Sequence, residues 1–350
     1  MQEPTTLPNP KTQRYTLGEL MVAAAAREIR DGEVVFVGMR LPLIAFVVAK
    51  RTHAPDAVGL FENGVIRTTP SPELIYTMAD PPNIKGATQC LDMLGVMSLL
   101  QSGKVDLGFL GAAEVDRFGN LNSTEVRGDK GYVRLPGSGG ACDIASLAKR
   151  FVVLLEHSKR RLPERVSYIT SPGNGDGAGW RKRVGLPRGG PAAAITTKAV
   201  LRFEEQSGEA YLHSAHPGVS VEDVVANTGW KLRVLDNVAV TPEPNEAELR
   251  AMRPHAYLVN IARGRVVDEA ALIRALREGW IAGAGLDVTE QEPLPADSPL
   301  YSMPNVILTP HISGNSIHYD ERLAALFADN LRRFRSGEPL LNRYDPSRGY

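Results

Sequence analysis

The chain has 350 residues, enough for two domains, and its 40 basic and 40 acidic side chains leave no formal net charge. That balance argues against a protein that holds the backbone of a nucleic acid or the surface of an anionic membrane. The two cysteines, Cys90 and Cys142, are too few for a disulfide framework or a zinc cluster, so we expect no metal. The longest apolar run, residues 41–49, is far too short to span a bilayer, and we expect a cytoplasmic protein.

Residues 1–14 are polar and proline-rich, without the apolar stretch of a signal peptide, so we predict a disordered lead. Behind them, Thr16 and Glu19 have the spacing of a capping box and begin the first helix. Helices then alternate with strands that are apolar throughout, the pattern of a parallel sheet covered on both faces. The expected helices cover 16–29 and 42–53, the expected strands 33–38, 57–61, 105–111, 151–157, 166–170 and 199–203, and the expected loops 173–180 and 187–194.

A second block of elements begins near residue 254. Asp268 caps a helix that Gly279 ends, and a last helix with regularly spaced apolar residues covers about 316–334. The chain is therefore predicted to be α/β, with a first domain over 15–250 and a second over 251–350. The expected strands of the second block are 256–262, 281–288 and 305–311.

A carboxylate, Glu62, follows the apolar strand at 57–61 and precedes the turn-forming pair Asn63-Gly64. Ligand crevices form at the carboxyl ends of strands in a parallel sheet, so Glu62 could serve as a nucleophile or a base. The alternative is an ordinary Asn-Gly turn in which Glu62 is a solvated flank, and the spacing alone favours it.

A glycine-rich segment at 135–146, LPGSGGACDIAS, leads into a predicted helix at 143–150. Its backbone N–H groups could bind an oxyanion, or its glycines could simply adopt positive φ in a tight loop, which on its own is the favoured alternative. Neither this segment nor 173–180 has the GxGxxG spacing of a dinucleotide-binding turn. The candidate N–H donors belong to Gly137, Ser138, Gly139, Gly140 and Ala141.

The second block contains an ordered set of polar residues, Arg263, Glu292 and His311. An arginine can clamp a carboxylate and polarise a carbonyl, and a histidine held by a carboxylate can transfer a proton. Taken singly, each has a plain alternative: a helix-flanking arginine, a loop glutamate, or a buried histidine bonded to the backbone.

Residues from about 15 to 250 resemble the B (β) chain of the glutaconate CoA-transferase type, within the class I CoA-transferases. The resemblance implies the three-layer parallel-sheet fold of that family and a partner A (α) chain in a hetero-oligomer. The segments that carry it, in family order, are GEVVFVGMRLPLIAFVVAKRTHAPD, LFENG, GAAEVDRFGNLNST, LPGSGGACDIASLAKR, RVSYITSPG, TTKAVLRFE, HPGVSVEDVVANTGW and TPEPNEAELR.

The resemblance implies that Glu62 is the nucleophile. It would attack an acyl-CoA thioester to give an acyl-glutamyl anhydride, which CoA thiolate converts into a glutamyl-CoA thioester. A small carboxylic acid then accepts the CoA through the reverse steps. A carboxylate suits this exchange because both of its acyl adducts remain activated. The segment 137–141 becomes a candidate part of the oxyanion pocket.

Three features depart from the family pattern. Arg40 stands where the family has glycine in a GxGLP-like turn, and a bulky cation there could alter access to the CoA site. Glu114 stands where glutamine is common. The partner's GGFxxxGxP-like loop is absent, so we expect this chain to be inactive without an α subunit.

Residues from about 248 to 350 resemble the C-terminal part of D-isomer-specific 2-hydroxyacid dehydrogenases. This implies that Arg263 binds the substrate carboxylate and carbonyl, that His311 transfers the proton, and that Glu292 holds His311. The glycine-rich strand–turn–helix and the separate substrate domain are missing upstream, so we expect an incomplete Rossmann-like segment. The resemblance places Ile261, Ala262, Asp287 and Gly314 near the nicotinamide of NAD.

Three hypotheses therefore stand. The first is a CoA-transferase subunit acting on acyl-CoA and a small acid; the second is an NAD-dependent oxidoreductase with the first block as scaffold. In the third, the tail is a non-catalytic assembly module, because a half-domain exposes a sheet edge and an apolar face. The segment NEAELRAMRP fits both families at the junction, as expected of a fusion, a recombination or a sequence error.

Overall fold

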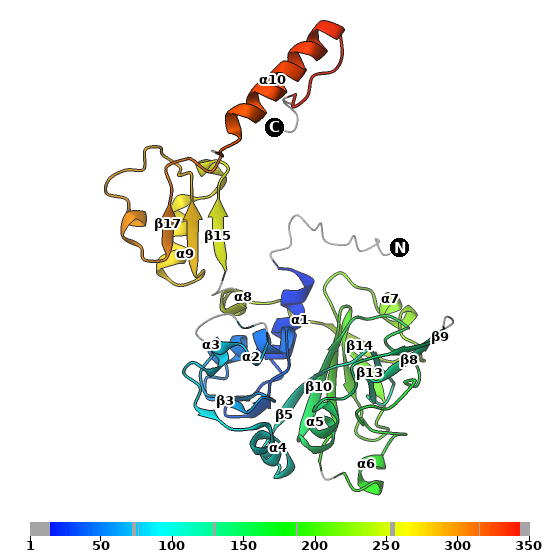
Figure 1. The fold of residues 1–350 in the computed structure, drawn as a ribbon. Helices are drawn as coiled ribbons and strands as arrows, with labels where there is room; N and C mark the ends of the chain where they lie inside the picture. Colours follow the sequence, from blue (N-terminus) through cyan, green and yellow to red (C-terminus); the bar gives the residue numbers. More distant parts are fainter. Residues whose placement is uncertain are drawn as a thin grey trace. The chain divides into compact units, whose positions relative to one another are not determined.

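A computed structural model of the chain describes residues 15–71, 75, 77–128, 131–186, 188–252, 256–314 and 316–343. The disordered lead predicted for residues 1–14 lies outside these residues. The backbone divides into two compact units, Met1–Arg253 and Pro254–Tyr350 (Figure 1).

The first unit is built on a ten-stranded sheet with the order β14-β13-β12-β11-β10-β5-β1-β2-β3-β4. Its strands are β1 (Val34–Phe36), β2 (Val58–Leu60), β3 (Val65–Arg67), β4 (Gln89–Cys90), β5 (Leu107–Gly111), β10 (Arg150–Leu155), β11 (Pro191–Thr196), β12 (Ala199–Phe203), β13 (Ala210–Ala215) and β14 (Arg233–Val240). Its helices are α1 (Leu17–Ala26), α2 (Leu41–Arg51), α3 (Pro81–Ile84), α4 (Met93–Gln101), α5 (Ala141–Leu147), α6 (Trp180–Arg183), α7 (Val221–Ala226) and α8 (Glu246–Met252).

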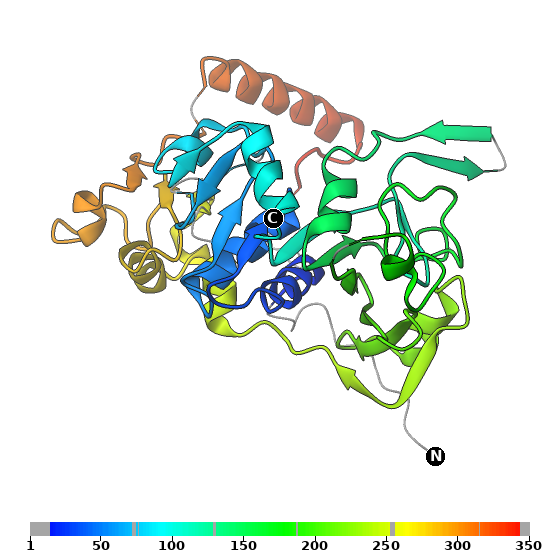
Figure 2. The same ribbon diagram turned by 90° about the horizontal axis from the view of Figure 1, so that it is seen from below.

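Two short antiparallel pairs stand outside that sheet. They are β6 (Glu114–Val115) with β7 (Leu121–Asn122), and β8 (Glu125–Gly128) with β9 (Gly131–Arg134). Figure 2 shows β8 and β9 as a hairpin that projects from the body of the unit.

The central strands are apolar on both faces because helices cover both. Val35 and Val37 face a core cluster that includes α1, α2 and Ala251, whereas Phe36 between them faces a second cluster with α4 and α5. Strand side chains alternate between faces, so this division is what a helix–sheet–helix sandwich requires. The predicted three-layer α/β fold is therefore confirmed.

Two sequence expectations are wrong in this unit. Residues 166–170 form no strand: Ser167 donates its N–H and hydroxyl to Glu114, and Tyr168 is exposed. The loop expected at 187–194 contains most of β11, which pairs with β10 and β12 although alanine has little intrinsic strand preference. The sheet is also not wholly parallel, since β3, β4, β12 and β13 make antiparallel pairs.

Helix α8 packs in the first unit although it lies at the junction of the two resemblances. Arg27 donates to both carboxylate oxygens of Glu248 at 2.8 and 2.7 Å, and also to the carbonyls of Pro242 and Glu243. Asn245 and Glu248 exchange hydrogen bonds in the manner of a capping box. The point where one resemblance gives way to the other therefore lies in α8, a helix that packs in the core of the first unit.

The second unit contains a parallel three-stranded sheet in the order β15-β16-β17. The cap predicted at Asp268 is confirmed, because its carboxylate accepts the N–H of Ala271. The elements are β15 (Tyr257–Asn260), η1 (Gly264–Val266), α9 (Glu269–Arg277), β16 (Gly283–Leu286), η2 (Pro299–Ser302), β17 (Val306–Leu308) and α10 (Tyr319–Ser336).

Only one face of this small sheet is covered in the described part of the unit. Leu272 and Leu276 of α9 pack with Ala284 and Leu286 of β16. Helix α10 has no buried residue, and its apolar side chains Leu323, Phe327, Leu331 and Phe334 are exposed. No helix among the residues that the structure describes is both long enough and apolar enough to cross a bilayer.

Candidate functional site

The turn after β2 positions Glu62. Gly64 donates its N–H to the carbonyl of Phe61, and the Asn63 side-chain amide donates to the carbonyl of Met78. Gly64 has φ of +102°, and a Cβ there would lie 1.9 Å from the carbonyl oxygen of Leu91. Only glycine fits this position, so the Asn-Gly turn holds Glu62 at the carboxyl end of its strand.

Glu62 lines a pocket of about 420 Å³. The walls come from the carboxyl ends of β1, β2 and β5, from the first turn of α2 and from the start of α5. Such a crevice is where parallel sheets place their ligands, as expected from the sequence. The lining residues are Phe36, Val37, Gly38, Met39, Arg40, Leu41, Pro42, Glu62, Met78, Phe109, Leu110, Gly111, Ser138, Gly139, Gly140, Ala141, Ile144 and Leu154.

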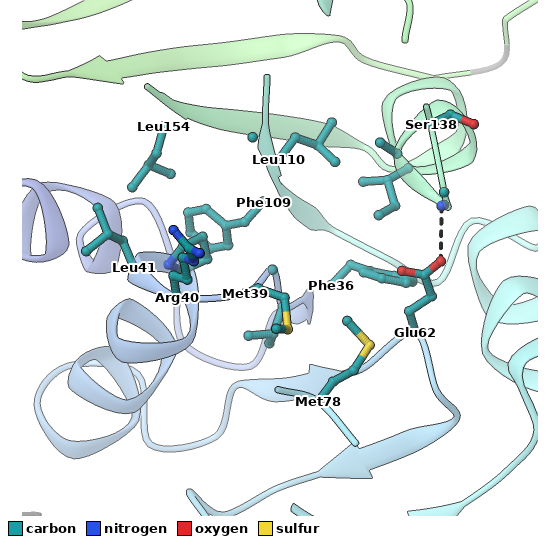
Figure 3. A pocket seen from close by; sticks show the side chains of 18 residues that line it. Phe36, Met39, Arg40, Leu41, Glu62, Met78, Phe109, Leu110, Ser138 and Leu154 are labelled. Atoms are coloured by element: carbon teal, nitrogen blue, oxygen red, sulfur yellow. Dashed lines mark hydrogen bonds between the residues drawn. The ribbon is translucent and has the colours of Figure 1, made fainter. Parts of the chain in front are cut away.

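The carboxylate of Glu62 faces the glycine-rich segment. The backbone N–H of Gly140 donates to Oε1 of Glu62 at 3.0 Å, marked by the dashed line in Figure 3. A Cβ on Gly140 would lie 3.0 Å from the same oxygen, so a larger residue there would make the carboxylate shift. A backbone donor on one carboxylate oxygen can stabilise negative charge that forms there during acyl transfer.

The five predicted N–H donors do not all share this role. Ser138, Gly139, Gly140 and Ala141 line the pocket, but Gly137 does not. The N–H of Gly137 donates to the carbonyl of Ser123, and that of Ala141 donates to the carbonyl of Ser138. Gly137 and Gly139 have φ of +101° and +49°. The segment is therefore both a tight loop with glycines at positive φ and part of the wall of the pocket.

Sequence reasoning missed most of the apolar wall. Phe36, Met39 and Met78 line the pocket, and Arg40, noted only as a departure from a family pattern, lines it too. Glu114 lies elsewhere: it is buried and accepts hydrogen bonds from Asn122 and from Ser167. No local pattern signals the methionines, since they come from a loop and a turn that meet only in the folded chain.

The second unit has a pocket of its own, of about 610 Å³, with Asp287, Glu292 and His311 in its wall. Nδ1 of His311 lies 2.9 Å from Oε2 of Glu292, and this hydrogen bond lowers the pKa of Glu292. The pair matches the predicted arrangement of a histidine held by a carboxylate. Both side chains are nearly half exposed, at 49% and 41%, so water screens their interaction.

Asp287 serves the fold of this unit. Its carboxylate accepts hydrogen bonds from the Thr309 hydroxyl and from the N–H groups of Ile312 and Ser313. Burial alone would raise the pKa of Asp287, but the hydrogen bonds from Ser313, Thr309 and Ile312 outweigh it and hold the pKa well below its usual range. Through these hydrogen bonds, the carboxylate of Asp287 holds the loop at 309–313 in place.

Four other residues lie outside that pocket: Arg263, which was predicted to bind the substrate, and Ile261, Ala262 and Gly314, which were predicted to contact NAD. Arg263 donates to the carbonyl of its neighbour Ala262 and is exposed, as is Ile261; Gly314 follows the ordered loop. The described part of the unit has three strands and no glycine-rich turn to hold a pyrophosphate. The residues present therefore do not fit NAD. No group of three or more potential metal ligands occurs among the described residues.

Comparison with known proteins assigns the first unit. A family model described as coenzyme A transferase matches residues 19–227. The β chain of the 3-oxoadipate CoA-transferase of Pseudomonas knackmussii is 42% identical over 242 residues, covering 68% of this chain and 92% of that one. The crystal structure of glutaconate coenzyme A-transferase from Acidaminococcus fermentans matches with a TM-score of 0.64 and 32% identity, covering 69% of this chain and 94% of that chain.

The second unit matches a different family, over a fragment. The NAD-binding domain of D-isomer-specific 2-hydroxyacid dehydrogenases matches residues 243–313. The glyoxylate reductase of Korarchaeum cryptofilum is 54% identical over 93 residues, which are 27% of this chain and 28% of the reductase. Since the first match covers more than half of the chain and the second only a fragment, the chain belongs to the coenzyme A transferase family and carries a dehydrogenase-like segment at its C-terminal end.

Proposed function

We propose that the chain is the β-type subunit of a heteromeric CoA-transferase and that Glu62 is its nucleophile. The observation that carries the proposal is the hydrogen bond from the Gly140 N–H to Oε1 of Glu62 inside the pocket at the strand ends. A half-buried carboxylate with one backbone donor is oriented for attack and has a donor ready for an oxyanion.

The transfer then proceeds in balanced steps. A Glu62 oxygen bonds to the thioester carbonyl carbon, the C–S bond breaks, and CoA leaves as a thiolate while an acyl-glutamyl anhydride forms. The thiolate attacks the glutamyl carbonyl, the donor acid leaves as its carboxylate, and a glutamyl-CoA thioester remains. The acceptor acid runs the same steps in reverse. The Gly140 N–H stabilises the negative charge that forms on the glutamyl carbonyl oxygen when the CoA thiolate, and later the acceptor acid, attacks that carbonyl.

We also propose that residues 15–250 form the working domain and that an α subunit completes the site. The relatives that resemble this domain are named as the β-type chains of transferases for 3-oxoadipate and glutaconate. The ligands of the pocket are accordingly an acyl-CoA and a small carboxylic acid, with the segment 138–141 against the reacting carbonyl.

Replacement of the nucleophile tests this function. In the chain assembled with a CoA-transferase α subunit, Glu62→Gln should lower acyl-CoA exchange by at least about 10³-fold, because an amide cannot form the anhydride. Exchange is measured with labelled acid, and mass spectrometry follows a CoA adduct on residue 62. Glu205→Gln, a matched change at an exposed glutamate, is the control. Full exchange by Glu62→Gln would exclude the mechanism.

An NAD-dependent oxidoreductase is the second candidate function. The contact between His311 and Glu292 favours it, since that pair could transfer a proton to or from a hydroxyl group. The missing pyrophosphate turn counts against it, and we assign no hydride transfer to this unit. The exposed apolar residues of the second unit favour the third hypothesis, a module for assembly.

A further inference from the structure

The pocket around Glu62 contains a second charged side chain that the transfer steps do not use. Of the described residues that line it, only Arg40 and Glu62 are charged. Figure 3 shows the two on opposite sides of the pocket, with Met39 and Phe36 between them in this view. The pocket thus presents a carboxylate at one side, a guanidinium at the other and an apolar wall between.

The backbone at Arg40 is one that glycine adopts and other residues avoid. Its φ is 62° and its ψ is −118°, where a Cβ crowds the chain. Arg40 is the N-cap of α2, a position that its guanidinium cannot cap because it has no hydrogen-bond acceptor. Glycine would adopt this conformation without strain, so the strained arginine points to a role for its side chain outside the local structure.

The guanidinium is also available. Among the described residues, no hydrogen bond or ion pair involves the Arg40 side chain, which is exposed at the pocket. Other arginines of the unit are engaged: Arg150 pairs with Glu33, and Arg181 donates to backbone carbonyls. An unpaired guanidinium in a ligand pocket is suited to a carboxylate, which it can bind with two parallel hydrogen bonds.

We propose that Arg40 is a specificity-determining residue that binds the distal carboxylate of a dicarboxylic acyl group while Glu62 reacts with the other end. This inference rests on the proposed transfer function. The apolar side chains of Phe36, Met39 and Met78 would contact the methylene chain between the two ends. A volume of about 420 Å³ is at the lower end of ligand pockets and suits an acyl group rather than a whole CoA molecule.

The phosphates of CoA are another possible source of negative charge for Arg40, and the substrate pair distinguishes the two. Glutaryl-CoA and pentanoyl-CoA have the same chain length and the same CoA, and differ in the distal carboxylate. With acetate as the common acceptor, kcat/KM is measured for both in the assembled transferase. The wild type should prefer glutaryl-CoA, and Arg40→Met should lower its kcat/KM by about 10–100-fold while changing that of pentanoyl-CoA by less than about threefold.

Two further variants sharpen the test. Arg51→Met removes the same charge from the other end of α2, where the side chain is exposed and does not line the pocket, and should keep the wild-type preference. Arg40→Gly should lose the preference and raise Tm by about 2–4 °C, because it relieves the backbone strain. This variant therefore separates loss of recognition from loss of folding.

Three outcomes would overturn the proposal. An equal loss with both acyl-CoAs would assign Arg40 to the CoA phosphates. An unchanged ratio in Arg40→Met, or a wild type without preference for glutaryl-CoA, would show that Arg40 does not read the acyl group. Failure of the transfer mechanism is a separate result, since it appears as exchange by Glu62→Gln whatever the substrate preference.

Discussion

The sheet of the first unit is covered on both faces, whereas the described sheet of the second unit is covered on one. In the first, Val35 and Phe36 enter separate cores on opposite faces. In the second, Tyr257, Val259 and Ile307 share the face away from α9 and are 74%, 70% and 72% exposed. The second unit therefore has parallel strands and motif residues typical of a family, but its described part lacks a layer of helices over the second face of the sheet.

The histidines of the two units show the same contrast in their electrostatics. His157 is buried between Thr196 and the carbonyl of Val224, and burial lowers its pKa to about 4. His311 in the second unit is half exposed beside Glu292. The first environment holds a neutral imidazole as part of the fold, while the second leaves an imidazole accessible to water and to small molecules.

After replacement of Glu62 itself, the largest expected effect comes from a methyl group at the contact between Gly140 and Glu62. A Cβ at Gly140 would lie 3.0 Å from Oε1 of Glu62 and 2.8 Å from Cε of Met97, so Gly140→Ala must displace the carboxylate. Its backbone φ of −75° allows alanine, so folding should survive. We expect acyl-CoA exchange to fall about 10²-fold.

The matched control is Gly18→Ala in α1, where the added Cβ meets nothing closer than 3.9 Å. Exchange by this variant should equal that of the wild type. Normal exchange by Gly140→Ala would mean that the position of the Glu62 carboxylate does not govern the reaction.

Acid should destabilise the first unit through His157. Its pKa is about 6.5 in the unfolded chain and about 4 in the native state, so the unfolded chain binds more protons between these values. The stabilisation is complete above pH 6.5 and is lost as the pH falls toward 4, by about 3 kcal/mol for this group. Burial lowers the pKa of His216 as well, which acts in the same direction.

Chemical denaturation at several pH values between 5 and 7 measures this effect. His157→Gln should flatten the dependence of the unfolding free energy on pH, while His318→Gln, at an exposed histidine, should leave it unchanged. Equal slopes in the wild type and in His157→Gln would show that the buried imidazole is not the group that titrates.

The smallest effect is expected from removal of the second unit. A chain ending after Met252 keeps α8, whose Ala251 is buried in the core with α1 and α2, and should retain exchange within about twofold. A chain ending after Arg250 loses that packing and should be about 1–2 kcal/mol less stable. Unfolding followed by circular dichroism compares the two. If the longer truncation product lost exchange, the second unit would be part of the transferase site.

Local sequence patterns predicted elements whose cause is local. The capping box of Thr16 and Glu19, the cap at Asp268 and the turn after Glu62 involve residues within a few positions of each other, and all three are present. The strand at 191–196 was missed because its run of alanines has little intrinsic strand preference, and its pairing with β10 and β12 is a tertiary contact. The stretch at 166–170 has the residue types of a strand but forms none, and the N–H of Ser167 donates to the buried Glu114 carboxylate and not to a neighbouring strand.

The sequence by itself determined the α/β class, the position of Glu62 at a strand end and the junction of two families, because periodicity, turn chemistry and motif order are properties of short segments. Only the tertiary structure decided which groups meet there. The Gly140 N–H reaches Glu62 across 78 residues, and Arg40 enters the same pocket on a strained turn. Such contacts depend on the order of the strands in the sheet. That order is determined by the packing of helices on both faces of the sheet, and no short segment contains that information.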